Sequence, residues 1–379
     1  MIYFDNSATT KPYPEVIDSF IKVSTAYFGN PSSLHGLGVK AEKLLTQSRK
    51  QVADLLQVKS TEVYFTSGGT EGNNLAVKGT AHAYSKRGKH IITTVMEHAS
   101  IKETCKSLEE EGFSVTYLPV DSNGLVSVED LKNALRTDTI LVSIMSVNNE
   151  VGSIQPIVEI GHLLKERPQV LFHVDHVQGI GKIPLDLAAA GIDLCTISGH
   201  KFHGLKGTGV LYVRDGIRVS PLFTGGNQEA KLRSGTENVA GFVALARALR
   251  LTLQKSAQDY GKLTEIRDML WNGLNEITGV KINSPLHGAP HIINFSIPGM
   301  KSEVFIHSLE EKEIYVSTTS ACSSKKKSIS DTVFAMFHDQ KRAESVIRIS
   351  TSYGNELYEA ELVLQEIKNT LSKLQKVMR

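Results

Sequence analysis

The chain has 379 residues, 41% of them hydrophobic, and a formal net charge of +2 at pH 7. This near-balance gives no case for nucleic acid or an anionic membrane as an obligate partner. No apolar run approaches the roughly 18 residues of a membrane-spanning helix, and the polar, acidic N-terminus does not resemble a secretory signal. The three cysteines have no metal-ligand spacing and make a poor disulfide framework. We therefore expect a soluble cytoplasmic protein with no metal site.

From about residue 39 onward, helical patterns alternate with short apolar runs. Helical periodicity is found at 39–58, 71–87, 100–111, 127–135 and 157–165. The apolar runs, which we expect to be strands, lie at 90–95, 113–118, 140–147, 170–175, 193–198 and 209–213. Continuous apolar strands alternating with amphipathic helices indicate βαβ units and a largely parallel sheet.

The C-terminal part has a different pattern. Two long helices with few breaks are predicted between about 237 and 277, and we expect a domain boundary near residue 255. Runs at 291–297 and 346–350 are typical of strands, and 302–312 and 356–377 of helices. The whole is predicted to be an α/β protein with a second, smaller α/β unit at its C-terminus.

A lysine follows one of the predicted strands. In SGHKFHGLKGTGVLYV, Ser198, His200 and Lys201 stand where the strand 193–198 ends. In open α/β sheets, ligands bind at the carboxyl ends of strands, and a lysine amine can bond covalently to an aldehyde cofactor. The alternative is a surface turn with a solvated lysine.

Small residues separate another apolar run from a helix. In FTSGGTEGNN, Gly69 and Thr70 precede the helix, so its first N–H groups are accessible to an anion such as phosphate. The alternative is ordinary capping of the helix by threonine or serine. The stretch is not a nucleotide-binding loop, because no lysine follows the glycines.

Asp175 ends the buried run LFHVD, where a carboxylate is costly unless a cation approaches it. A protonated pyridine nitrogen is such a cation, and Gln178 is placed to reach a ring hydroxyl. The alternative for Asp175 is a cap at the turn between strand and helix.

His98, in MEHAS, follows a strand and is suited to stack on an aromatic ring or to transfer protons; lone histidines are more often structural. Asn149, in VNNEVG, offers neutral hydrogen bonds just past a strand, although adjacent asparagines often simply form turns. Taken together, an amine, a phosphate cradle, a carboxylate for a ring nitrogen and a stacking imidazole specify pyridoxal 5′-phosphate.

Cys322 lies in VSTTSACSSKKKS, among hydroxyl groups and three lysines. Nearby cations favour the thiolate, and a thiol in so polar a segment is accessible to solvent. The residue types therefore indicate a reactive cysteine rather than a core residue, but not which reaction it performs.

The motifs DNSATT, GNPSSLHGLG, TSGGTEGNN, EHAS, NNEVG, VDHVQ, SGHKFHGLKGTG, GGNQEAKLRSGTENVAG, SACSS and RIS follow one another in order. In this the chain resembles the cysteine desulfurases, class V aminotransferase-like enzymes of the fold type I pyridoxal-phosphate group. The resemblance implies a large domain, 13–255, with a mostly parallel seven-stranded sheet flanked by helices. It also implies a small domain, 1–12 with 256–379, that carries the active-cysteine loop at about 316–330.

By the same resemblance, Lys201 is the lysine that binds the cofactor, Asp175 contacts its ring nitrogen, Gln178 its ring hydroxyl, and His98 stacks on the ring. The implied phosphate ligands, near Gly69, are Thr70, Ser198, His200 and, from a partner subunit, Thr236. Asn149 also belongs to the implied cofactor site, and with Arg348 it is implied to bind the substrate carboxylate; a structural salt bridge is the alternative for Arg348.

Cys322 resembles the cysteine that accepts sulfur from L-cysteine as a persulfide and passes it to a protein acceptor. The implied assembly is a homodimer. Selenocysteine lyase, another class V lyase or transaminase, or a catalytically idle scaffold are the rival interpretations. The chain departs from the usual family pattern at Gly72, His176, Leu205 and Thr319.

Overall fold

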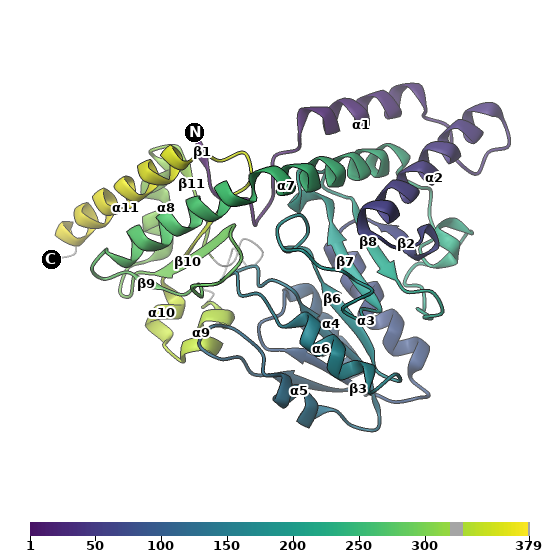
Figure 1. Cartoon of the computed structure of the whole chain (residues 1–379), viewed down its shortest axis with the longest axis horizontal. Helices are drawn as coiled ribbons and strands as arrows, with labels where there is room; N and C mark the ends of the chain where they lie inside the picture. Colours follow the sequence, from purple (N-terminus) through teal and green to yellow (C-terminus); the bar gives the residue numbers. More distant parts are fainter. Residues whose placement is uncertain (319–328, 378–379) are drawn as a thin grey trace.

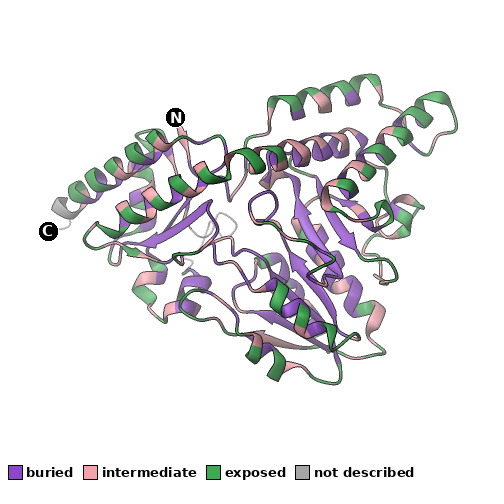
Figure 2. Ribbon diagram, viewed as in Figure 1, coloured by how far each residue is buried: buried purple, intermediate pink, exposed green. Residues whose placement is uncertain are grey.

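The computed structural model describes residues 1–318 and 329–377; Thr319 and Cys322 lie outside the described residues. The chain forms an α/β structure in which a large central sheet lies between helices, with a smaller group of strands and helices at one side (Figure 1). Most strands are buried, whereas the helices alternate buried and exposed faces (Figure 2). No helix in the described part of the chain is long and apolar enough to cross a membrane.

The central sheet has seven strands in the order β2-β8-β7-β6-β5-β3-β4. They are β2 (Val63–Thr66), β3 (His90–Thr94), β4 (Ser114–Leu118), β5 (Thr139–Met145), β6 (Leu171–Asp175), β7 (Leu194–Ser198) and β8 (Gly209–Val213). Only β8 runs antiparallel to its neighbours, β2 and β7; the other pairs are parallel. The predicted seven-stranded, mostly parallel sheet is therefore confirmed.

Alternate residues of each strand pack against different helices, since successive side chains point to opposite faces. Leu141 and Leu171 contact the cluster that contains α3 (Gly69–Tyr84) and α4 (Ala99–Glu110). Their neighbours Val142 and Phe172 belong to the cluster with α5 (Val128–Ala134) and α6 (Ile157–Lys165). Burial on both faces explains why these strands are uninterrupted apolar runs.

Two further helices, α1 (Pro14–Ala26) and α2 (Gly36–Leu56), pack beside α7 (Val239–Asn275). The prediction of two long helices in this region is wrong, because α7 is one helix of 37 residues. It contains no proline, and its internal Gly261 costs only about 1 kcal/mol relative to alanine. Apolar contacts hold both halves: Leu249 in the cluster with α2, and Leu270 in the C-terminal cluster.

The smaller part contains the antiparallel strands β9 (Lys281–Ile282), β10 (Ile292–Ser296) and β12 (Val346–Ser350), in the order β12-β10-β9. Its helices are α8 (Ser302–Glu310), α9 (Asp331–Phe337), α10 (Gln340–Glu344) and α11 (Leu357–Val377).

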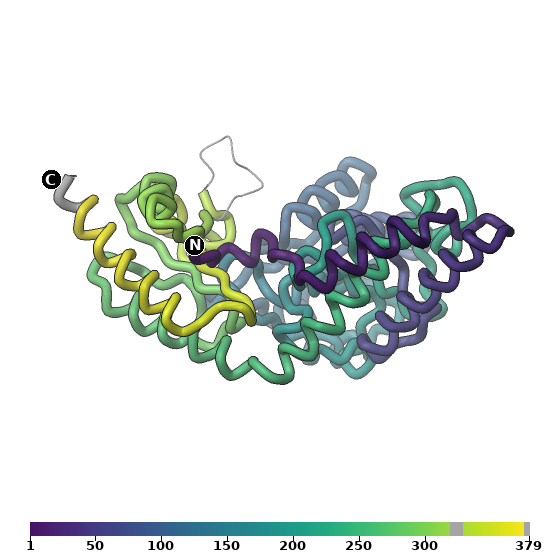
Figure 3. Tube along the Cα trace, turned by 90° about the horizontal axis from the view of Figure 1, so that it is seen from above, coloured from purple at the N-terminus to yellow at the C-terminus, as the bar shows by residue number. Residues whose placement is uncertain are grey.

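The N-terminus joins this part of the molecule. Strand β1 (Ile2–Tyr3) pairs in parallel with β11 (Ile314–Tyr315), and Phe4 is fully buried in the core formed with α8 and α11. Figures 1 and 3 show the N-terminal strand beside the C-terminal elements before the chain passes on to α1. This placement brings segment 5–10 between the two parts of the molecule, where the candidate site lies.

Candidate active site

Side chains from several strand ends converge on one cavity. It has a volume of ≈ 420 Å³ and lies where β7 ends and α3 begins. Its walls are formed by Ala8, Thr9, Ser67, Gly68, Gly69, Thr70, Glu71, Ser198, His200, Lys206 and Gly207. Of the predicted phosphate ligands, Gly69, Thr70, Ser198 and His200 therefore lie together.

The N-terminus of α3 forms a cradle for an anion. Its N-cap, Gly68, has φ 146° and ψ −171° and no side chain with which to cap the helix, so the first N–H groups stay available. A Cβ at Gly69 would lie 3.1 Å from Cγ2 of Val177 and 3.6 Å from Cβ of Ser198, so a larger residue there would require Val177 to shift slightly. Capping by threonine or serine, the alternative interpretation, is wrong, and the donors fit a phosphate group.

The negative charge of Glu71, at the rim of this cradle, is compensated by an ion pair. Its carboxylate accepts hydrogen bonds from Arg233 Nε at 2.9 Å and from the Ser67 N–H at 3.1 Å. Burial alone raises the pKa of Glu71, but the bonds from Arg233 and Ser67 outweigh it and lower the pKa. The ion pair leaves Lys206 in the cavity wall as a cation for an anionic ligand.

Asp175 is only 5% exposed at the end of β6. Its Oδ2 accepts from Nδ2 of Asn73 at 2.7 Å, and its Oδ1 accepts from the N–H of Val177 at 3.0 Å. The bond from Val177 is the turn cap that the sequence left as an alternative. Both donors are neutral, so the buried carboxylate remains suited to a cationic ring nitrogen.

His98 is the N-cap of α4. Its Nδ1 accepts from the Ser100 N–H at 3.2 Å and lies 2.8 Å from Ser100 Oγ. Burial lowers the pKa of His98, partly offset by Asp175, so the ring is neutral at pH 7. His98 therefore has a structural role, since Nδ1 caps the helix. The other ring nitrogen, Nε2, remains available for proton transfer.

Lys201 and Gln178 both contact the N-terminal segment. Lys201 Nζ donates to the carbonyl of Ser7 at 2.5 Å and to that of Ala8 at 2.8 Å, and Gln178 Nε2 donates to Ser7 at 3.0 Å. A solvated surface lysine, the alternative interpretation, does not describe Lys201. Next to it, burial and then the charge of Lys201 lower the pKa of His200 to about 4.

Arg348, in β12, is 4% exposed. Its Nη1 donates to the backbone carbonyl of Asn149 at 2.7 Å, and its Nη2 donates to Asp5 Oδ1 at 3.2 Å and Ser317 Oγ at 2.9 Å. The structural salt bridge is therefore real. Nε has no partner among the described residues, so the guanidinium keeps a donor for a further acceptor.

Of the predicted site residues, only Gly69, Thr70, Ser198 and His200 line the cavity itself. Lys201 reaches its wall through the carbonyl of Ala8, and Asp175 contacts α3 through Asn73. Thr236 is exposed, in the segment that follows Arg233, and does not line the cavity. Cys322 lies outside the described residues. Their roles stay predictions.

The sequence interpretation missed Asn73, Lys182 and Lys206. Asn73 lies one turn of α3 past Gly69 and is buried, which an asparagine on a helix face seldom is without a partner. Lys182 donates to the carbonyl of Lys201 at 2.8 Å. An isolated lysine in GIGKIPL gave no signal of its own, since its importance depends on burial.

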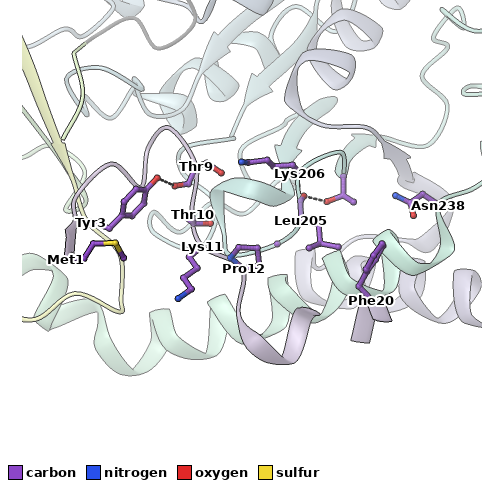
Figure 4. Close-up of a pocket in the computed structure, with 12 residues that line it drawn as sticks. Met1, Tyr3, Thr9, Thr10, Lys11, Pro12, Phe20, Leu205, Lys206 and Asn238 are labelled. Carbon is purple, nitrogen blue, oxygen red and sulfur yellow. Dashed lines mark hydrogen bonds between the residues drawn. The ribbon is translucent and has the colours of Figure 1, made fainter. Parts of the chain in front are cut away.

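A larger cavity, of ≈ 670 Å³, lies beside the first and shares Thr9 and Lys206 with it. Figure 4 shows Met1, Pro12, Phe20 and Leu205 around it, and the Tyr3 hydroxyl directed to the backbone of Thr9. Its lining combines these apolar side chains with threonines, lysines and Asn238. We place the chemistry in the smaller cavity, where the strand-end groups meet.

A model of the aminotransferase class-V family matches residues 2–363. The chain belongs to this family. A NifS/IcsS protein homolog of Lactobacillus delbrueckii subsp. bulgaricus is 49% identical over 99% of both chains. The cysteine desulfurase IscS of Methanosarcina thermophila is 42% identical, over 98% of this chain and 92% of its own. A solved NifS-like protein has a TM-score of 0.92 at 39% identity, covering 98% of this chain and 99% of its own.

Class-V aminotransferases of this kind are pyridoxal-phosphate enzymes, and the cavity fits that cofactor. The α3 N-terminus suits its phosphate, and Asp175 suits its ring nitrogen. The role of Lys201 as the amine stays a prediction. The family and the geometry thus agree on the cofactor that the sequence predicts.

Proposed function

We propose that the chain is a cysteine desulfurase that converts L-cysteine to L-alanine and transfers the sulfur to Cys322 as a persulfide. The observation that carries the proposal is the α3 cradle in the cavity wall, with Lys201 bonded to the carbonyl of Ala8 in that wall and Asp175 bonded to Asn73 of α3. The chain is also similar over its whole length to proteins named cysteine desulfurase. Pyridoxal phosphate, when bound, supplies an electron sink for the negative charge that develops at the substrate Cα.

The residues assigned to the cofactor divide by the part they hold. Gly69, Thr70, Ser198 and His200 would hold the phosphate, with Thr236 contributed by the partner subunit. Asp175, held by Asn73, would keep the ring nitrogen protonated. Gln178 would bind the ring hydroxyl, and His98 would stack on the ring.

Arg348 and Asn149 hold the substrate carboxylate, for which a guanidinium fork is well suited. The Lys201 amine takes the Cα proton, and Nε2 of His98 transfers a proton near the sulfur. The Cys322 thiolate attacks the sulfur of L-cysteine, so that an S–S bond forms and the C–S bond breaks. Cβ then accepts a proton, and Lys201 returns the proton that it took from Cα, which gives alanine. Sulfur and electrons balance, since a thiol and cysteine give a persulfide and alanine.

The proposed assembly is a homodimer in the cytoplasm. The dimer is supported by Thr236, which lies on the surface rather than in the cavity of its own subunit. The persulfide then passes to a protein acceptor. Iron–sulfur cluster assembly is the destination we favour; transfer-RNA thiolation and synthesis of sulfur-containing cofactors are the alternatives.

The test is Cys322→Ala, with Cys105→Ala as the matched control because Cys105 is buried in the core. Cys322→Ala should keep the visible absorption of the bound cofactor but lose alanine formation by on the order of 10³-fold or more, as expected when a nucleophile is removed. Cys105→Ala should retain the activity. Full activity in Cys322→Ala would remove this thiol from the mechanism.

The rival interpretations can be distinguished by the substrate that is turned over and by the visible colour of a bound cofactor. A selenocysteine lyase would turn over selenocysteine but not cysteine, and a transaminase would require a keto acid. An idle scaffold would bind no cofactor and would be colourless.

A further inference from the structure

The turn that follows Asn227 is strained and is held by a buried ion pair. Glu229, Ala230 and Lys231 have φ values of 46°, 52° and 67°, the left-handed region that residues other than glycine rarely adopt. Three such residues in succession persist only where surrounding contacts hold them. Glu229 supplies such a contact: it is 7% exposed and forms an ion pair with Arg49 of α2.

This ion pair also covers the edge of the central sheet. Both carboxylate oxygens of Glu229 accept from the Arg49 guanidinium, Oε1 from Nη2 at 2.6 Å and Oε2 from Nη1 at 2.7 Å. Oε2 also accepts from the N–H of Phe65 at 2.8 Å, and Nη1 donates to the carbonyl of Val63 at 2.6 Å. In the described part of the chain, β2 has a strand beside it only on the side of β8. The pair therefore bonds the free edge of β2 as a neighbouring strand would, and it fixes the turn to the sheet.

The same turn leads directly to the rim of the anion cradle. The N–H of Leu232 donates to the carbonyl of Glu229 at 2.9 Å, which closes the turn. Arg233, the next residue, donates from Nε to the carboxylate of Glu71 at 2.9 Å, and its guanidinium carbon lies 5.8 Å from the centre of the Phe223 ring. The position from which Arg233 meets Glu71 is therefore set by the turn that Glu229 holds.

We propose that Arg49 and Glu229 are positioning residues for the phosphate end of the cofactor site: they hold the strained turn so that Arg233 compensates the charge of Glu71. Glu71 lines the cavity beside the α3 cradle, where an uncompensated carboxylate would repel a phosphate group. The inference deepens the proposed function, because it depends on this cavity binding the phosphate of pyridoxal phosphate.

The test compares pyridoxal 5′-phosphate with pyridoxal, which has the same ring and aldehyde but no phosphate. Each is titrated into the full chain freed of cofactor, and visible absorption gives the affinity. Arg49→Lys keeps the charge but loses the bidentate contact, and should weaken binding of pyridoxal phosphate about threefold. Arg49→Met combined with Glu229→Gln leaves no buried charge unpaired, and should weaken it about tenfold. Both variants should bind pyridoxal as the wild type does.

Removing Arg233 shows whether the ion pair acts through it. Arg233→Met alone should weaken binding of pyridoxal phosphate about tenfold, because the charge of Glu71 is then uncompensated. Arg49→Lys added to Arg233→Met should cause no further loss, since two changes along one chain of contacts are not additive.

Arg214→Lys is the matched control. Arg214 Nε donates to Asp193 Oδ1 at 2.7 Å, and Asp193 Oδ2 accepts from the N–H of Phe172 at 2.7 Å. This contact also joins an arginine, a buried carboxylate and a strand N–H, but neither charged residue lines the cavity. Both affinities should stay at the wild-type values.

The proposal is overturned by an unchanged affinity for pyridoxal phosphate in folded Arg49→Lys, by an equal loss for pyridoxal, or by a further loss when Arg49→Lys is added to Arg233→Met. Arg49→Lys is the variant that decides if the double variant does not fold. A wild type that binds neither compound would instead contradict the proposed function.

Discussion

His173, at the centre of β6, is a buried imidazole two residues before Asp175. Its Nδ1 lies 2.8 Å from Ser143 Oγ and its Nε2 lies 3.0 Å from Thr196 Oγ1. Burial lowers the pKa of His173 to about 3, against about 6.5 in an unfolded chain. Below pH 6.5 the unfolded state therefore binds the extra proton, and stability present above that pH is lost as the pH falls toward 3.

Replacing His173 with Gln should remove this proton linkage. Between pH 6 and pH 4, the free energy of unfolding of the wild type should fall more steeply than that of the variant, by up to about 1.4 kcal/mol per pH unit. Urea denaturation at a series of pH values measures the slope. His162→Gln, on the exposed face of α6, is the control and should keep the wild-type slope; an equal slope in His173→Gln would show that the buried imidazole is not linked to folding.

The sequence allowed individual reacting residues to be predicted where a polar residue ends an apolar run. Asp175 and Ser198 are such cases, and the structure places both at strand ends. The ion pair between Arg348 and Asp5 joins residues 343 positions apart, and no local pattern indicates it. The departure at Gly72 also has a spatial reason, since a Cβ there would lie 2.7 Å from Thr196 Cγ2.

At the scale of elements, the start of α3 is the feature with the strongest consequence for binding. Gly68 has φ 146°, a backbone conformation that other residues adopt only at a cost of about 1–3 kcal/mol. Gly68→Ala should turn the first N–H groups of α3 away from the cavity and weaken binding of pyridoxal phosphate by roughly tenfold, on the scale of one strong hydrogen bond. Equilibrium titration followed by visible absorption measures the affinity.

Gly216→Ala is the matched control for that change. Gly216 also has positive φ, 87°, with nothing within 4 Å of an added Cβ, and it does not line the cavity. It should lower the thermal stability to a similar degree but leave the cofactor affinity unchanged. Equal loss of affinity in both variants would mean that general destabilisation, not the cradle, explains the effect.

Helices were predictable where their buried face repeats along the sequence, as in α2 and α6. The pattern does not predict α1, in which only Val16 and Val23 are buried. The break expected within 237–277 is absent from α7, because packing on two different clusters stabilises one long helix. Tertiary contacts thus decide whether a segment is helical where its local helix propensity is weak.

At the scale of the molecule, segment 5–10 connects the two parts of the chain to the cavity. Asn6 Nδ2 donates to the carbonyl of Ser350, Lys201 donates to Ser7 and Ala8, and Thr10 donates to the carbonyl of His200. The apolar pattern predicts the sheet but gives no sign of this route, because the segment has polar residues and little periodicity. The division into a large domain, 13–255, and a small domain, 1–12 with 256–379, stays a prediction, and α7 runs without a break through residue 255.

The proposed dimer requires a surface that a second copy can cover, and the segment between α1 and α2 offers exposed apolar side chains. Leu34 is 98% exposed and Phe28 is 70% exposed. Burying such residues at an interface contributes on the order of 2 kcal/mol each, so Phe28→Asp with Leu34→Asp should shift the protein to monomers at micromolar concentration. Because Thr236 would then be missing from each site, alanine formation should fall with the dimer fraction, as measured by sedimentation velocity alongside the assay.

Leu362→Asp, at a 51% exposed apolar position on α11 at the opposite end of the molecule, is the control and should remain dimeric and active. A monomeric wild type with full activity, or a double variant that stays dimeric, would exclude this surface as the interface that completes the site.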